Sequence, residues 1–230
     1  MLAPQRYVDW INAHLGFNPR SQANSNALSQ FILDDLRSAS SSIDRAISSA
    51  DLLAIGNANV PTKVTIRNVD LVLQERSAIK RLSVHLSVEH KTVMTAHGKA
   101  RKNRYGDIIA YCNHMHNHRS DCVAGATVVI NSSSLYENPD SFARGMTRPK
   151  FDMDKVVKDT VNIFVGIPLR ESPSDPNDQP EALTVIVVDY DGANPASLVS
   201  SELAPQIASH AHYDNFIIRL AAKYEDRFCV

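Results

Sequence analysis

The sequence has few of the residues and patterns that mark special classes of protein. Only three of its 230 residues are cysteines, too few and too widely spaced for a disulfide scaffold, which predicts a reducing, cytoplasmic setting. Only eight are glycines, and no glycine-rich phosphate loop or nucleophile-elbow pattern occurs. No apolar run approaches the roughly 18 residues needed to cross a bilayer, so we expect no membrane association. The N-terminus lacks the pattern of a signal peptide.

Charge of one sign is also missing. The chain has 24 basic and 25 acidic side chains, giving a formal net charge of −1. Overall charge therefore gives no indication of a nucleic-acid partner, and only local charge can do so. Hydrophobic residues make up 43% of the chain, enough for a substantial core. The length predicts a single domain, 1–230.

Apolar periodicity predicts alternating helices and strands. Spacing of three and four residues predicts helices, whereas β-branched or alternating runs predict strands. We expect helices at 4–16, 27–50, 97–118, 153–167 and 201–228, strands at 64–74, 81–94, 122–131 and 182–192, and loops at 18–26 and 171–181. The first two strands predict an antiparallel hairpin, and the strand-helix-strand unit at 82–131 predicts parallel pairing. The fold class expected is α/β, a three-layer sandwich with a mixed central sheet flanked by helices.

The strand at 81–94 carries charged residues at its end. Strict alternation puts Leu82, Val84, Leu86 and Val88 on one face, and Ser83, His85, Ser87, Glu89 and Lys91 on the other. Glu89 and Lys91 then project together, while His90 points the other way. The preceding strand holds Asp70 among apolar residues, where a carboxylate is costly unless it is paired. Hairpin pairing would bring Asp70 beside Glu89 and Lys91.

Two carboxylates and an ammonium group on neighbouring strands suit phosphodiester hydrolysis. Carboxylate oxygens bind hard cations such as Mg²⁺, for which Mn²⁺ can substitute, and the backbone carbonyl of His90 would complete the shell. The metal would supply hydroxide and neutralise charge on the phosphate. Lys91 would orient the attacking water or stabilise the phosphorus centre.

Asp70 followed one hairpin later by Glu89-His90-Lys91 resembles the motif of the PD-(D/E)XK nuclease superfamily, the fold of many type II restriction endonucleases. The resemblance covers 28–131 as a restriction endonuclease-like core, with 132–230 as an extension of the same domain. It implies that Asp70 and Glu89 bind metal and that Lys91 is catalytic. Val69 replaces the proline that often precedes the first acid. The family's further acid on the first helix stays open among Asp34, Asp35, Asp44 and Asp51.

Basic residues follow the motif in two segments. Lys99, Arg101, Lys102 and Arg104 lie at the start of the predicted helix at 97–118, where they would contact backbone phosphates. Arg144, Arg148 and Lys150 lie in a long loop and are further candidates for phosphate or base contacts. A solvated helix face is the alternative reading of the first group.

Two other polar clusters leave alternatives open. The segment 112–122 contains two cysteines and three histidines, but one helix cannot surround a zinc ion, so a histidine-rich helix end is the favoured interpretation. Asp189 and Asp191 end a buried strand, where they would form a second metal site or cap the following turn.

The sequence thus predicts a Mg²⁺-dependent DNA endonuclease, specifically a type II restriction endonuclease that acts on double-stranded DNA as a homodimer. A repair or recombination nuclease on the same core is the near alternative. The alternative of a different class is a non-catalytic α/β nucleic-acid- or protein-binding module. In that case Glu89 and Lys91 would form an exposed ion pair with no chemical role.

Overall fold

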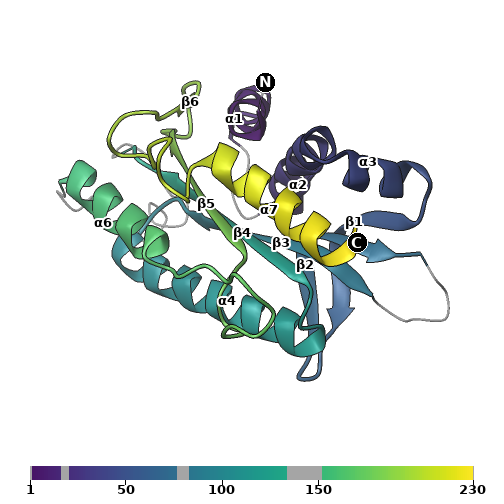
Figure 1. The fold of residues 1–230 in the computed structure, drawn as a ribbon. Helices are drawn as coiled ribbons and strands as arrows, with labels where there is room; N and C mark the ends of the chain where they lie inside the picture. The colour runs from purple at the N-terminus through teal and green to yellow at the C-terminus, as the bar shows by residue number, and fades with distance from the viewer. Residues whose placement is uncertain (1, 17–20, 77–82, 134–151, 230) are drawn as a thin grey trace.

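The protein is described by a computed structural model, which covers residues 2–16, 21–76, 83–133 and 152–229. In these ranges a six-stranded sheet lies between two layers of helices (Figure 1). The helices are α1 (Ala3–Ala13), α2 (Gln22–Ala39), α3 (Ser41–Ser48), α4 (His97–His118), α6 (Met153–Val165) and α7 (Tyr213–Phe228). The strands are β1 (Leu52–Pro61), β2 (Ile66–Glu75), β3 (Val84–Val93), β4 (Val123–Asn131), β5 (Ala182–Asp189) and β6 (Ser197–Leu198). The predicted α/β class is confirmed.

The strands follow one another across the sheet in the order of the chain, from β1 to β6. The β1–β2, β2–β3 and β5–β6 pairs are antiparallel, while β3–β4 and β4–β5 are parallel. The predicted hairpin and the predicted parallel unit are therefore both present. Helix α4 makes the β3–β4 crossover, and α6 lies in the β4–β5 connection. Strand β3 therefore belongs to both units, because it pairs antiparallel with β2 and parallel with β4.

Two apolar cores lie on opposite faces of the sheet. On one face α1, α2 and α7 pack on the strands, and α2 contributes Leu28, Ile32 and Leu36 at four-residue spacing. On the other face α4 and α6 cover the strands, and α4 buries Ile108 and Met115. Figure 1 shows α4 and α6 below the sheet and the remaining helices above it. Strands β4 and β5 are buried on both faces, which explains their continuous apolar runs.

Several predicted bounds were wrong. The strand β1 was missed, because its alanines, glycine and asparagines give a weak strand signal. The expected loop at 18–26 becomes helical at Gln22, where the Ser21 side chain caps α2 by accepting from the Asn24 amide. The expected helix at 27–50 breaks at Ser40, which caps α3. The C-terminal helix begins only at Tyr213, after turns.

The predicted alternation along β3 is also interrupted. Pairing with β2 shifts register between Leu73 and Gln74, so that Leu73 faces Leu86 and Gln74 faces Val84. This bulge gives β3 one extra residue, so the residues of β3 before the bulge point to the face opposite to the one that strict alternation predicts. His85 therefore stacks on Phe228 of α7, at 4.0 Å between ring centroids, and does not share the face of Glu89.

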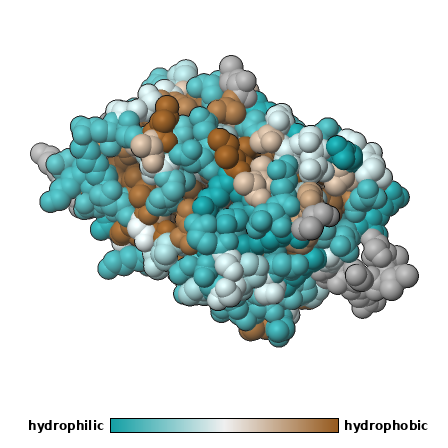
Figure 2. Space-filling view, viewed as in Figure 1, coloured by the Kyte–Doolittle hydropathy of each residue, from teal (hydrophilic) through white to brown (hydrophobic). Residues whose placement is uncertain are grey.

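Within the described residues, no helix is long and apolar enough to span a membrane. The surface seen in Figure 2 is mainly hydrophilic, with hydrophobic side chains in small groups.

Candidate active site

The two strands that carry the motif separate where its residues lie. Pairing between β2 and β3 runs from Gln74–Val84 to Leu71–Val88. Beyond that point β2 stays with β1, while β3 stays with β4 through Val93. Asp70 follows the last β2–β3 pair, and its Oδ2 accepts a hydrogen bond of 2.7 Å from the backbone N–H of His90. The carboxylate thus accepts the hydrogen bond that the next residue of a paired β2 strand would accept. We call the place where β2 and β3 separate the fork, and Asp70 lies in it.

Helix α2 holds Asp70 from the other side. Ser25 Oγ donates to Asp70 Oδ1, and Ser29 Oγ donates to the Asp70 backbone carbonyl at 3.0 Å. Together with the His90 amide, these contacts fix the carboxylate at both oxygens and its backbone. Ser25 and Ser29 were not predicted as site residues, because the segment containing Ser25 was read as a loop. Their four-residue spacing was the available signal.

Glu89 and Lys91 lie together on the face of the sheet that α4 covers, as alternation predicts. Lys91 Nζ donates to Glu89 Oε1 at 2.5 Å, and Arg67 Nη2 reaches the same oxygen at 3.2 Å. Glu89 is only 4% exposed, so it is not the exposed ion-pair member considered as an alternative. Its second oxygen, Oε2, is buried and has no hydrogen-bond partner within the part of the chain that the structure describes. A buried carboxylate oxygen without a partner is costly and calls for an explanation.

The surroundings of Glu89 raise the pKa of its carboxyl group. Burial is the largest cause, because it penalises the charged form. The Lys91 ammonium acts in the opposite direction, and the negative charge of Asp70 raises the pKa further. The net direction is upward in spite of two cations at Oε1. Glu89 is therefore a carboxylate whose charge is only partly compensated within the protein.

Arg67 is a site residue that the sequence analysis missed. Its guanidinium lies over the Tyr111 ring of α4, at 5.4 Å from the centroid, and donates to the Asp107 carbonyl at 3.3 Å as well as to Glu89. Tyr111 is itself fixed by a 2.6 Å hydrogen bond with Ser87. Three residues before Asp70 on the same strand, Arg67 gave no motif signal. Only the structure brings it to Glu89.

His90 points to the opposite face of β3, as expected. Its Nε2 contacts Ser29 Oγ at 2.9 Å and its Nδ1 contacts Thr127 Oγ1 at 2.7 Å. Burial lowers the pKa of the imidazole to about 4, so the ring is neutral at pH 7. In a strand, the N–H and C=O of one residue point to the same side. The His90 N–H points to Asp70, so its carbonyl also faces the fork.

Three kinds of oxygen donor near the fork are candidates to hold a hard divalent cation. They are the Asp70 carboxylate, the partnerless Glu89 Oε2 and the His90 carbonyl, all oxygen ligands of the kind that Mg²⁺ prefers. Among the described residues, no cluster of three or more acid, histidine or cysteine side chains is placed to hold a metal. A cation here would keep several waters, as Mg²⁺ usually does.

The basic residues of α4 divide into two pairs. Lys99 and Lys102 are exposed. Arg101 approaches Asp159 of α6 at 4.0 Å, and Arg104 binds Asp107 at 2.7 Å and the Thr92 carbonyl at 3.4 Å. Arg104 thus lies next to the end of β3 that carries Lys91, whereas Arg101 is directed toward α6. The other predicted contacts, Arg144, Arg148 and Lys150, lie outside the described residues.

The histidine-rich segment takes part in a buried ionic cluster. His116 Nε2 contacts Glu181 Oε2 at 3.0 Å, and the same oxygen accepts from the Ala124 amide at 2.7 Å. Glu181 Oε1 accepts from Arg170 at 3.3 Å and from Arg227 at 2.9 Å. Cys112 and Cys122 are buried thiols, and burial raises the pKa of each, that of Cys122 to about 12.

The remaining acids have other partners. Asp191 accepts from the backbone amides of Ala193 and Asn194, which lower the pKa of its carboxyl group to about 2, so it caps a turn as the second interpretation held. The acids considered for a third position bind elsewhere. Asp34 and Asp35 contact Arg6, Asp44 contacts Arg37 and Asp51 contacts Ser49.

Comparison of the chain with protein-family models, with curated proteins and with solved structures gives no match. The resemblance to PD-(D/E)XK nucleases therefore rests on the residues at the fork alone, Asp70, Glu89 and Lys91.

Proposed function

We propose that the protein is a Mg²⁺-dependent endonuclease that hydrolyses phosphodiester bonds of double-stranded DNA. The observation that carries the proposal is Glu89 Oε2, a buried carboxylate oxygen without a partner, beside Asp70 at a fork in the sheet. Folding alone does not explain such an oxygen, whereas a cation ligand position does.

Each residue at the fork has a distinct role in this proposal. Asp70, Glu89 Oε2 and the His90 carbonyl would hold Mg²⁺, which when bound polarises the phosphate and activates water. Lys91 is anchored on Glu89 Oε1 with its side chain 16% exposed, so its ammonium can contact a phosphate or the attacking water. Arg67, held by Tyr111 and Asp107, keeps a second positive charge near the same position.

The start of α4 supplies the phosphate contacts in this proposal. The helix begins at His97, shortly after β3 ends, so its positive N-terminal end lies near the strand end that follows Lys91. Exposed Lys99 and Lys102 add mobile charges there, and Arg104 adds a fixed one beside Thr92. Arg101 is the least suited of the four because of its orientation toward Asp159.

The direct test is cleavage of plasmid DNA with Mg²⁺. We expect cleavage by the wild type, none with EDTA, and a loss of at least about 10²-fold with Lys91→Ala. Lys155→Ala, at an exposed position of α6, is the matched control and should cleave like the wild type. A wild type inactive on unmethylated and methylated DNA of varied sequence would contradict the proposal.

Metal binding can be examined without activity. In crystals soaked in Mn²⁺, anomalous density should lie between Asp70 and Glu89 and should be absent in Glu89→Gln. Density elsewhere only, or none, would argue against the assigned ligands.

The narrower proposal is a type II restriction enzyme acting as a homodimer. Two copies would cut the two strands at a palindromic site. Discrete plasmid fragments, with a molar mass of two chains in light scattering, are the expected results. A smear from a monomer would favour a general repair or recombination nuclease.

The alternative is a binding module with a degenerate nuclease fold. The ion pairs of Lys91 and Arg67 with Glu89 favour it, because they already oppose the carboxylate charge. Under this alternative Lys91→Ala would weaken DNA or protein binding while Mg²⁺ would have no effect.

A further inference from the structure

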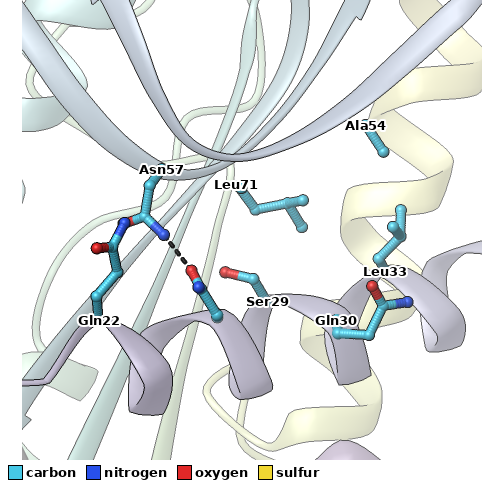
Figure 3. Close-up of a pocket in the computed structure, with 9 residues that line it drawn as sticks. Gln22, Ser29, Gln30, Leu33, Ala54, Asn57 and Leu71 are labelled. Atoms are coloured by element: carbon cyan, nitrogen blue, oxygen red, sulfur yellow. Dashed lines mark hydrogen bonds between the residues drawn. The ribbon is translucent and has the colours of Figure 1, made fainter.

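A polar pocket of about 270 Å³ lies between α2 and the β1–β2 hairpin (Figure 3). Four amides line it: Gln22, Asn26 and Gln30 from α2, and Asn57 from β1. Aliphatic side chains, including Leu33 and Leu71, contribute apolar surface, and none of the lining residues that the structure describes is charged. We call it the amide pocket. Its volume is just below the roughly 300–1,000 Å³ of small-molecule sites, so it has room for a single ring system.

The amide pocket shares a helix with the candidate active site. Gln22, Asn26 and Gln30 are four residues apart and form one stripe along α2. Ser25 and Ser29 form the adjacent stripe, and both hydrogen-bond to Asp70. Ser29 also lines the pocket. One turn of helix therefore connects the carboxylate at the fork to the pocket wall.

The β1 side of the pocket has an unusual backbone. Asn57 has φ +51°, in the left-handed region, where asparagine is one of the better tolerated residues. Its neighbours Gly56 and Ala58 pair with Leu71 and Val69, so Asn57 lies opposite Asp70. The Asn57 side chain donates to Asn26 Oδ1, the hydrogen bond that is drawn as a dashed line from Asn57 in Figure 3. Such backbone strain concentrates at ligand sites.

We propose that the amide pocket binds one nucleobase of the DNA strand, with adenine favoured, and so selects the sequence beside the cleaved bond. This rests on the proposed nuclease function. A carboxamide offers a donor and an acceptor, which match N7 and N6 of adenine. Gln30 Nε2 donates to Asp34 and Asn57 Nδ2 to Asn26 Oδ1, so the base would use Asn26 Nδ2, the oxygens of Asn57 and Gln30, and Gln22. The aliphatic side chains suit the flat face of the ring. The lining residues that the structure describes carry no positive charge, which favours a neutral base over a phosphate group.

The first experiment does not depend on cleavage. Deoxyadenosine monophosphate is titrated into ¹⁵N-labelled protein while the side-chain amide signals are recorded. We expect shifts at Gln22, Asn26, Gln30 and Asn57 that deoxyribose 5-phosphate does not produce. Absence of shifts, or equal shifts with the sugar phosphate, would overturn the proposal.

Two variants and one control test the pocket itself. Asn57→Gly removes one amide at a position whose φ suits glycine, and Gln22→Ala with Gln30→Ala removes two from exposed helix positions. Both should abolish the adenine-dependent shifts of the remaining amides. Asn113→Ala, an exposed amide on α4, should leave them unchanged. Shifts that survive both pocket variants would overturn the assignment.

The second experiment sequences the ends of DNA cut by the wild type and the variants. Adenine should be enriched at one fixed distance from the cut, and the pocket variants should reduce that enrichment roughly 5- to 150-fold. Other positions should keep their preferences. Unchanged preferences in an active enzyme would overturn the pocket proposal and leave the nuclease intact. Amide shifts with an inactive wild type would support the pocket and overturn only the nuclease function.

Discussion

Two buried glutamates of this protein contrast in how their charge is compensated. Glu181 has hydrogen-bond or ion-pair partners at both oxygens, from His116, Ala124, Arg170 and Arg227. Glu89 has two cations at Oε1 and none at Oε2. The protein thus supplies partners for both carboxylate oxygens of Glu181 but for only one carboxylate oxygen of Glu89.

The two environments move the pKa values of the carboxyl groups in opposite directions. Burial acts upward on both, and it dominates at Glu89. At Glu181 the hydrogen bond and charge of His116, with the charge of Arg227, outweigh burial, and the pKa is lowered. The partners at both oxygens of Glu181 account for its buried charge, whereas the unpartnered Oε2 of Glu89 is the position that our proposal assigns to a cation.

The largest expected effect is on stability at Glu181. Glu181→Gln leaves Arg170 and Arg227 buried without a counter-charge, and we expect a loss of about 3–5 kcal/mol in the free energy of unfolding. Glu89→Gln should cost no more than about 1 kcal/mol, since Lys91 can turn to water and Arg67 keeps the Asp107 carbonyl. Urea titration of the three proteins measures both. Equal losses would remove the contrast.

The reverse order is expected for DNA cleavage. Glu89→Gln should lower the rate by about 10²–10³-fold, because it removes a charged ligand from the fork. Glu181→Gln, assayed at a temperature where it stays folded, should keep the wild-type rate within a few-fold. A Glu181→Gln variant that is folded yet inactive would show that the two clusters are coupled.

Divalent cations sharpen the comparison further. Saturating Mg²⁺ should stabilise the wild type by about 2.7 kcal/mol at a hundredfold excess over Kd, and raise the melting temperature by several degrees. Glu181→Gln should gain the same increment, and Glu89→Gln should gain none. Calorimetry with and without Mg²⁺ gives the three values, and an equal gain in Glu89→Gln would place the cation elsewhere.

The smallest expected effects are on the pH dependence of stability. The raised pKa of Glu89 means that its contribution is fully present below the ordinary value of 4.5 and lost as pH rises through the folded-state value. The lowered pKa of Glu181 gives the opposite sign: its contribution is present above 4.5 and lost as pH falls through the folded-state value.

Glutamine mimics the protonated acid at all pH values and so isolates each contribution. As pH rises from about 4.5 through the folded-state pKa of Glu89, the wild type should lose stability relative to Glu89→Gln. Below about pH 4.5 it should lose stability relative to Glu181→Gln as pH falls. If the stability of the wild type changes with pH in parallel with the stability of both variants, the assignment of opposite pKa shifts is contradicted.

The sequence predicted the parts of the fold that have strong local signals. Buried strands such as β4 and β5 and the long helix α4 were recognised, and so was the hairpin that brings Asp70 toward Glu89. The strand β1 was missed because its small and polar residues are typical of turns. The bulge near His85 was missed because β3 is buried on both faces there, so Val84 and Leu86 fit one alternating pattern although they lie on opposite faces.

The site divides in the same way. Glu89 and Lys91 are two residues apart on one strand, so their common face follows from geometry alone. The contact of Arg67 with Glu89 depends on which elements meet in three dimensions, and no spacing in the chain encodes it. The partnerless oxygen of Glu89 is likewise a property of packing, and only coordinates can identify it.

The order of strands along the sheet has a consequence for synthesis of the chain. Because neighbours in sequence are neighbours in the sheet, each strand can dock on a partner that has already left the ribosome. Asp70, Glu89 and Lys91 meet within one hairpin, early in translation. The Glu181 cluster needs Arg227 of α7, so it can form only after that helix has emerged. We infer that the contacts around Asp70 and Glu89 can form before those of the Glu181 cluster.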